Sequence, residues 1–195
     1  MFSFADFANI FIVVIFSTAF IKIATTLTIF RYGLGLKGAT FGLVVLVFSL
    51  VLSFFVMQPV VAPGGGWAGL VQADKISIDK AAKVLLPFME QHTEPSVKES
   101  FADLLTSKSL TGDVTADWSF TLATFMVSEL KAAFYLGLIF IIPFLLIDLL
   151  IVNILAMLDI SQISAGLLAL PCKLLLFHLA DGWQLVAEKI IYAYL

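Results

Sequence analysis

The sequence predicts an all-α, membrane-associated protein built of helical hairpins, with about four long hydrophobic helices and two short amphipathic helices in a polar insert. Apolar residues make up 61% of the chain and charged residues 13%, compared with about 45–50% and 25% in typical soluble domains. With a mean hydropathy of +1.07, one water-soluble core cannot account for so much apolar surface. The apolar–polar alternation of a strand recurs nowhere along the chain. The 195 residues suit a single domain, residues 1–195, in a membrane.

Residues 1–58 are predicted to form a pair of hydrophobic helices. The first apolar segment runs roughly from Phe4 to Ile21 and can continue through the threonine-rich ATTLTIF. Because no basic region precedes it, we interpret it as a retained membrane helix rather than a signal peptide. The second segment, Ala39 to Met57, contains no charged residue and stops at Gln58-Pro59. Its length is close to the roughly 20 residues that a membrane span requires.

A short basic stretch separates these two segments. We expect residues 22–37 to form a loop that holds Lys22, Arg31 and Lys37 and no acidic residue. The positive-inside rule places such a loop in the cytoplasm. The N-terminus and the polar insert then lie on the outer side of the membrane, and the loop at 159–170, which lacks Lys and Arg, lies inside.

Residues 59–119 form the polar insert. Between Pro63 and Asp117 it holds five Lys, no Arg and eight Asp or Glu, so it is acidic. The stretch DKAAKVLLPFMEQ, residues 79–91, favours a helix in which Pro87 is a kink or a stop. The stretch EPSVKESFADLL, residues 94–105, predicts a second helix with one apolar face, formed by Val97, Phe101, Leu104 and Leu105.

Residues 120–195 contain the other two apolar segments. One runs from Ala132 to Leu158 and includes Pro143, Asp148 and Asn153. The other, Pro171 to Leu195, carries four charged residues and a histidine: Lys173, His178, Asp181, Glu188 and Lys189. Because so many polar groups are costly in lipid, we expect this segment to lie inside an assembly. Gly182-Trp183 marks a candidate break within it, although Trp183 also suits a membrane interface.

Asp148 is the charge that most needs an explanation, because an aspartate at mid-bilayer costs roughly 2.5 to 3.5 kcal/mol. We predict a buried ion pair for it, with Lys22 or Lys173 as the partner. The alternative is a position near a helix end, reached by tilt or snorkelling. Glu129 and Lys131 are two residues apart and point to different faces of a helix, so they cannot pair with each other. Each needs another helix, another subunit or the membrane boundary.

The sequence offers no catalytic, cofactor-binding or metal-binding constellation, so we predict that the protein is not an enzyme. His178 and Asp181 are three residues apart, but the only other histidine is His92 in the insert, and the single cysteine cannot form a site. Gly33, Gly35 and Gly38 do not follow a strand and lack a Lys-Ser/Thr ending, so they indicate a turn. A net charge of −3 and the absence of a basic patch argue against nucleic-acid binding.

Two blocks in the C-terminal part carry a resemblance to a known family. VSELKAAFYLGLIFIIPFLLIDLLIVNIL followed by LPCKLLLFHLADGWQLV resembles the two signature regions of the FliP/SctR family. Its members are core components of the flagellar and injectisome (type III secretion) export gates. FIKIATTLTIFRYGLG and SFFVMQPV also fit the family pattern. Tyr135 and the stretch LKGATFG depart from it.

The resemblance implies a structural, pore-forming subunit of the bacterial inner membrane, with the insert on the periplasmic side. It implies a homo-oligomeric ring of five copies, with FliQ/SctS-like and FliR/SctT-like membrane proteins. FlhA/SctV-like and FlhB/SctU-like export-gate proteins would be further partners, and unfolded secreted proteins would be the substrates. The alternative is a subunit of a small-solute channel or transporter with Asp148 and Lys173 lining the path. A transporter should show repeated halves or paired broken helices, and the sequence indicates neither.

The resemblance also implies a pore constriction formed by a methionine-rich loop. The corresponding stretch here is AMLDISQISAG, in which Ile160, Ser161 and Gln162 occupy the methionine positions and Asp159 stands where glycine is usual. Our candidates for the constriction are six consecutive residues: Leu158, Asp159, Ile160, Ser161, Gln162 and Ile163. Methionine would seal such a ring by flexible packing, so we expect a weaker seal here or one completed by another subunit.

Overall fold

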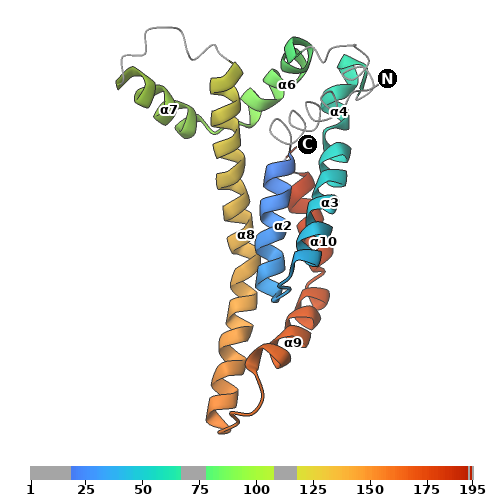
Figure 1. Ribbon diagram of the computed structural model, residues 1–195, viewed down its shortest axis with the longest axis vertical. Helices are drawn as coiled ribbons and strands as arrows, with labels where there is room; N and C mark the ends of the chain where they lie inside the picture. The colour runs from blue at the N-terminus through green and yellow to red at the C-terminus, as the bar shows by residue number, and fades with distance from the viewer. Residues whose placement is uncertain (1–18, 67–77, 108–117, 193, 195) are drawn as a thin grey trace. The chain divides into compact units, whose positions relative to one another are not determined.

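A computed structural model describes residues 19–66, 78–107, 118–192 and 194 (Figure 1). The helices are α2 (Phe20–Leu34), α3 (Ala39–Val56), α4 (Gln58–Val61), the short 3-10 helix η1 (Ala62–Gly64), α6 (Ile78–His92), α7 (Pro95–Ser107), α8 (Trp118–Met157), α9 (Ala165–Leu179) and α10 (Gly182–Ile191). No strand occurs in these ranges, and the predicted all-α fold class is confirmed. Most of the predicted first apolar segment, Phe4 to Ile21, lies outside the described residues.

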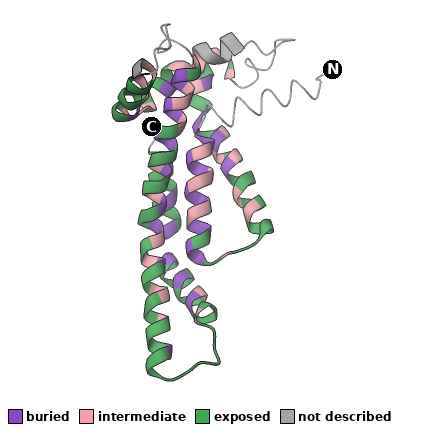
Figure 2. Ribbon diagram, turned by 60° about the vertical axis from the view of Figure 1, so that its left-hand side comes forward, coloured by how far each residue is buried: buried purple, intermediate pink, exposed green. Residues whose placement is uncertain are grey.

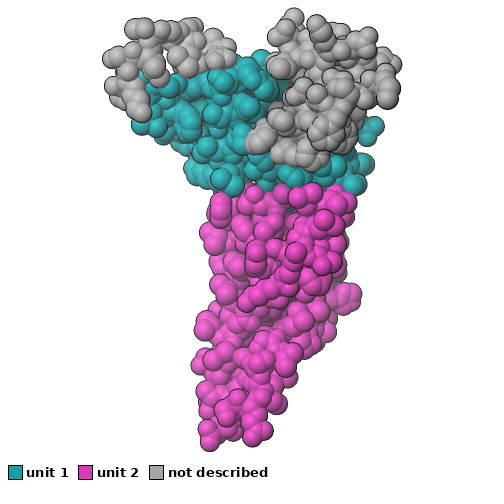
Figure 3. All heavy atoms as spheres, viewed as in Figure 1, with its two compact units in different colours: residues 1–23, 49–132 teal, residues 24–48, 133–195 magenta. Residues whose placement is uncertain are grey.

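The chain divides into two compact units (Figure 3). One contains residues 1–23 and 49–132, and the other contains residues 24–48 and 133–195. Helices α2, α3 and α8 each contribute residues to both units. The end of α3 and the start of α8 group with the insert helices in the first of these units, and the division at residues 58/59 and 119/120 stays a prediction.

The expected loop at residues 22–37 is wrong, because most of it is helix α2. Lys22 and Arg31 are both buried rather than exposed in a loop. The helix ends in a Schellman motif, in which the Leu36 N–H donates to the Arg31 carbonyl and the Gly35 N–H to the Tyr32 carbonyl. Gly35 supplies the positive φ of 84° that this motif requires. Only residues 35–38 connect α2 to α3.

Helix α3 matches the predicted second segment to within one residue. Helix α8 is longer than the predicted segment Ala132 to Leu158. It begins at Trp118 and runs for 40 residues. In its first turns the Thr124 hydroxyl donates to the Phe120 carbonyl, so this polar side chain is satisfied inside the helix. Both α3 and α8 are long and apolar enough to cross a membrane.

The predicted fourth segment, Pro171 to Leu195, is two helices rather than one. Helix α9 begins at Ala165, before the predicted start, and α10 follows it at an angle of 67°. The break falls at Asp181, whose φ is 47°. A Cβ on Gly182 would overlap the ring of Phe177, so only glycine fits the start of α10. The candidate break before Trp183 is therefore present in the structure.

The insert helices lie close to their predicted positions. Helix α6 continues through Pro87 to His92, so this proline does not stop the helix. In the first unit, α4 and η1 pack against α6, and the Phe88 and Phe125 rings pack edge to face at 5.8 Å. Helix α7 begins with Pro95 at its first position, where the missing N–H costs nothing.

The core of the second unit is aromatic. Phe30 of α2 contacts Phe140, Phe144, Phe177 and Trp183, with ring centroids 4.9 to 6.2 Å apart. Figure 2 shows mainly buried and intermediate residues along α2 and many exposed residues along α8. Helix α2 is thus the central element against which α8, α9 and α10 pack.

Candidate functional site: paired charges and an exposed loop

Lys173 is the centre of the most polar site in the second unit. Its Nζ lies 2.7 Å from Oδ2 of Asp148 and 2.9 Å from the carbonyl oxygen of Gly33. The lysine side chain is 6% exposed and the aspartate side chain 40% exposed. The Lys173 ammonium group therefore connects α2, α8 and α9. Of the two candidate partners of Asp148, Lys173 is the one that contacts it.

Gly33 makes this arrangement possible. A Cβ at this position would lie 3.0 Å from side-chain atoms of both Ile141 and Phe144 on α8. Such contacts are closer than ordinary packing, so glycine lets α2 approach α8 closely. The Gly33 carbonyl, at the end of α2 where it has no helical partner, then accepts a hydrogen bond from Lys173.

A pocket of about 510 Å³ surrounds the pair, and its lining includes Tyr32, Lys37 and Ser164. In this pocket the charge of Asp148 is balanced by Lys173, which leaves no isolated carboxylate to act as an acid or base. Among the residues that the structure describes, no three His, Cys, Asp or Glu side chains group as metal ligands. His178 and Asp181 do not share one helix, because Asp181 lies at the break between α9 and α10.

Lys22 and Glu129 form the second buried pair, in the first unit. Lys22 Nζ lies 3.4 Å from Glu129 Oε1, and the two side chains are 7% and 3% exposed. The residues are 107 positions apart, on α2 and α8. Glu129 therefore finds its partner on another helix of the same chain.

Lys131, predicted to belong to a buried pair, instead forms a surface pair. Its Nζ lies 2.6 Å from Glu94 Oε1, and its side chain is 59% exposed. The hydrogen bond from Lys131, with a second from the Ser96 hydroxyl, lowers the pKa of Glu94. The Glu94 N–H donates to the Ser128 hydroxyl, so these contacts fasten the start of α7 to α8.

The loop after Met157 contains the six candidate constriction residues. Leu158, Ile160 and Ile163 are exposed there. The end of α8 forms a Schellman motif, in which the Ile160 N–H donates to the Leu155 carbonyl and the Asp159 N–H to the Ala156 carbonyl. Asp159 has a φ of 54°, a conformation in which glycine is unstrained and aspartate is tolerated. This geometry explains how aspartate can stand where the resemblance leads one to expect glycine.

Two important positions were not singled out from the sequence. A Cβ on Gly137 would lie 2.6 Å from Cδ1 of Ile29, so this glycine permits close contact between α2 and α8. An isolated glycine within an apolar helical segment was the sequence signal that could have indicated this close contact. Arg31 was assigned to a loop, yet it is buried beside Tyr32 and Gly38.

These features define a helical membrane protein whose long apolar helices carry a few internally paired charges. The FliP family model matches residues 5–190. The chain belongs to the FliP family.

Curated relatives come from flagellar and from secretion systems. The flagellar biosynthetic protein FliP of Cereibacter sphaeroides is 33% identical over 91% of this chain and 60% of its own length. Harpin secretion protein HrpW of Pseudomonas syringae pv. syringae is 32% identical over 91% of both chains. Yop proteins translocation protein R of Yersinia pestis is 31% identical over 92% of this chain and 88% of its own length. The chain spans 52% to 60% of the length of two of its flagellar relatives.

Proposed function

We propose that this protein is a structural, pore-forming subunit of a type III secretion or flagellar export gate in the bacterial inner membrane. The observation that carries the proposal is the match of the FliP family model to residues 5–190. Flagellar and secretion proteins fall in one narrow range of identity to this chain, 31% to 33% for the three described above. The two kinds of export system are therefore both covered by the proposal. Its substrates would be unfolded proteins, and its role would be passive rather than enzymatic.

The proposed assembly is a ring of five copies with FliQ/SctS-like and FliR/SctT-like membrane proteins. FlhA/SctV-like and FlhB/SctU-like proteins would complete the gate. Exposed apolar side chains on α8 support an assembly, among them Leu138, Leu145 and Leu149. In a membrane these surfaces face either lipid or another subunit, and the charged residues of α9 and α10 favour protein neighbours.

The proposed constriction is the loop from Leu158 to Ile163. Its support is local: the residues are consecutive, exposed and apolar at three positions. Five copies around an axis would place five Asp159 carboxylates near the collar of Ile160 side chains. Such a ring favours cations over anions at the mouth.

We further propose that the polar insert faces the periplasm. Fewer basic residues support this orientation than the sequence indicated. Lys22 and Arg31 are buried in α2, so only Lys37 lies in the 35–38 turn. A cysteine at exposed Ser100 of α7, in a Cys172→Ser background, tests the orientation. Labelling of intact cells by an impermeant thiol reagent is expected. Labelling only after lysis would place the insert in the cytoplasm.

Deletion of the gene in its own bacterium tests the proposed function. We expect a class of flagellar or injectisome proteins to disappear from the culture medium, and the class that disappears identifies the system. Restoring the full chain should restore secretion. Unchanged secretion combined with altered uptake of a small solute would favour the channel or transporter alternative.

A further inference from the structure

Arg31 is a buried cation without a counter-ion in the part of the chain that the structure describes. The residue is 9% exposed, and its Nε is buried without a hydrogen-bond partner. Its Nη1 donates to the Gly38 carbonyl at 2.8 Å, and its guanidinium carbon lies 4.6 Å from the centre of the Tyr32 ring. Lys22 and Lys173, by contrast, each have a carboxylate partner. A buried arginine is normally paired, so an anion is expected beside Arg31.

The guanidinium lies at the N-terminus of α3. Gly38 directly precedes this helix, and a Cβ on Gly42 would lie 3.3 Å from Arg31 Nη1. The free N–H groups and the dipole of an 18-residue helix make its N-terminus positive, so a cation there is unfavourable and an anion favourable. Arg31 and the N-terminus of α3 are thus two positive features without an acidic partner among the described residues, whereas the exposed Lys37 of the adjoining turn lines the pocket that holds Asp148.

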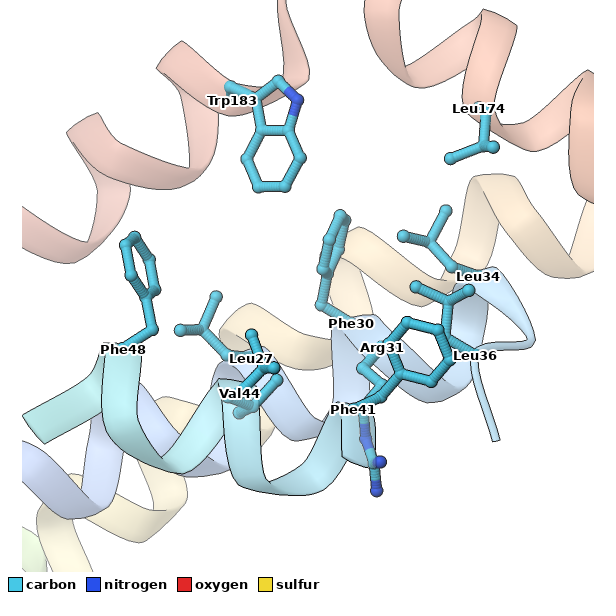
Figure 4. A pocket seen from close by; sticks show the side chains of 11 residues that line it. Leu27, Phe30, Arg31, Leu34, Leu36, Phe41, Val44, Phe48, Leu174 and Trp183 are labelled. Atoms are coloured by element: carbon cyan, nitrogen blue, oxygen red, sulfur yellow. The ribbon is translucent and has the colours of Figure 1, made fainter. Parts of the chain in front are cut away.

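An apolar cavity of about 400 Å³ adjoins the same arginine. Figure 4 shows side chains of Phe30, Leu27, Val44, Phe48 and Trp183 around it, while the Arg31 guanidinium points away from it. The volume is within the range of small-ligand sites, and the cavity opens to the surface at the exposed residues Val44, Phe48 and Trp183. The cavity therefore accepts a hydrocarbon group, and a negative charge that contacts the Arg31 guanidinium has to lie outside the cavity.

We propose that Arg31, the N-terminus of α3 and this cavity bind an anionic phospholipid, with one acyl chain in the cavity and the phosphate at Arg31. Two observations favour a lipid over a carboxylate from another protein. The first is that α3 is a candidate membrane span that begins at the charged end of the site. The second is that Arg31 lines an apolar cavity while its guanidinium points out of it, so a lipid can place an acyl chain inside and its phosphate outside the rim. The site is separate from the proposed export role.

Trp183 lines the cavity and provides a direct probe. The chain has three tryptophans, so replacing Trp67 and Trp118 with phenylalanine leaves only Trp183. The full chain is placed in nanodiscs that contain phosphatidylglycerol or phosphatidylcholine with brominated acyl chains, which quench nearby tryptophan. Half-maximal quenching should require about tenfold less phosphatidylglycerol than phosphatidylcholine, because the phosphate forms a charge-assisted contact.

Four variants distinguish the effect of the Arg31 charge, the effect of the cavity and the effect of an unrelated surface substitution. Arg31→Gln should abolish the preference for phosphatidylglycerol, and Arg31→Lys should retain most of it. Val44→Phe should reduce quenching by both lipids, because the larger ring occupies the cavity without changing the charge. Lys98→Gln, at an exposed lysine of α7, should change nothing. Circular dichroism identifies any variant that has not folded, and Val44→Phe tests the site without altering Arg31.

Equal quenching of Trp183 by the two lipids in the unmodified site would overturn the proposal. A protein carboxylate would instead be the counter-ion if bromolipids fail to quench Trp183 in the assembled complex while Arg31→Gln weakens complex formation. That result would also overturn the lipid site. Neither result would affect the secretion phenotype that tests the export role.

Discussion

Lys173 and Asp148, 25 residues apart in the sequence, form an ion pair in which the lysine is buried and the aspartate remains partly exposed. The lysine also donates to the Gly33 carbonyl, so three helices meet at its ammonium group. A carboxylate within the apolar α8 is tolerated because α9 supplies its counter-ion.

Asp148→Ala should therefore destabilise the protein by leaving Lys173 buried with one neutral acceptor. We expect a cost of about 2–3 kcal/mol, below the roughly 3–5 of a fully buried pair because Asp148 is 40% exposed. Asp148→Asn should cost less, since its amide oxygen still accepts a hydrogen bond. The fraction of chain recovered in folded complex after mild detergent extraction measures the effect. Glu94→Ala, which breaks the surface pair with Lys131, is the matched control and should leave recovery unchanged. Equal recovery of Asp148→Ala and the parent would mean that Lys173 does not need this partner.

The Lys22–Glu129 pair gives a stricter test because both side chains are almost fully buried. Glu129→Ala should cost roughly 3–5 kcal/mol, since it removes the carboxylate that pairs with the buried Lys22. The double substitution of Lys22→Met with Glu129→Leu should recover most of this loss, because two apolar side chains replace both charges. Thermal unfolding followed by helical circular dichroism compares the three proteins. A double variant as unstable as Glu129→Ala would show that the pair has a role beyond charge balance.

Gly137 should not tolerate a side chain. In Gly137→Ala the new Cβ would lie 2.6 Å from Ile29 Cδ1, and we expect a loss of about 1–3 kcal/mol. Gly166→Ala is the control, because nothing lies within 4 Å of its added Cβ and alanine favours a helix. Combining Gly137→Ala with Ile29→Ala should recover part of the stability. If both glycine variants melt at the parent temperature, α2 and α8 do not pack at Gly137 as described.

The loop after α8 can be changed to test whether it forms the proposed constriction. Deletion of residues 160–162 should raise the permeability of cells to small ions without abolishing assembly. Ile160→Met should leave permeability unchanged or lower it, because methionine packs flexibly into a collar. Ion leak in cells that contain the assembled complex is the measurement. A deleted loop with an unchanged leak in an intact complex would move the gate elsewhere.

The sequence predicts the charge-free helix α3 almost to the residue, because an apolar run between Gly38 and Gln58-Pro59 has clear ends. It fails at residues 22–37, where lysine and arginine suggested a loop. The buried Lys22 pairs with Glu129, 107 positions away, and such a partner leaves no local pattern in the sequence. The candidate site was predicted only in part. Its charged residues stood out in apolar surroundings, but only the fold decides that Asp148 pairs with Lys173 and that Lys131 pairs with Glu94.

Two further differences between the prediction and the structure concern the ends of helices. The predicted fourth segment began at Pro171, yet α9 begins six residues earlier and includes this proline. Asp159 ends α8 in a conformation that usually indicates glycine, so its residue type concealed the motif. The break before α10 was easier to anticipate, because Gly182-Trp183 marks it in the sequence; the structure adds that Phe177 excludes a side chain at Gly182.

The composition and mass of the complex extracted in mild detergent are the most direct test of the export-gate role. We expect several copies of this chain together with two different small hydrophobic proteins, and little free monomer. A stable, fully helical monomer that associates with neither itself nor such partners would contradict its assignment as an export-gate subunit.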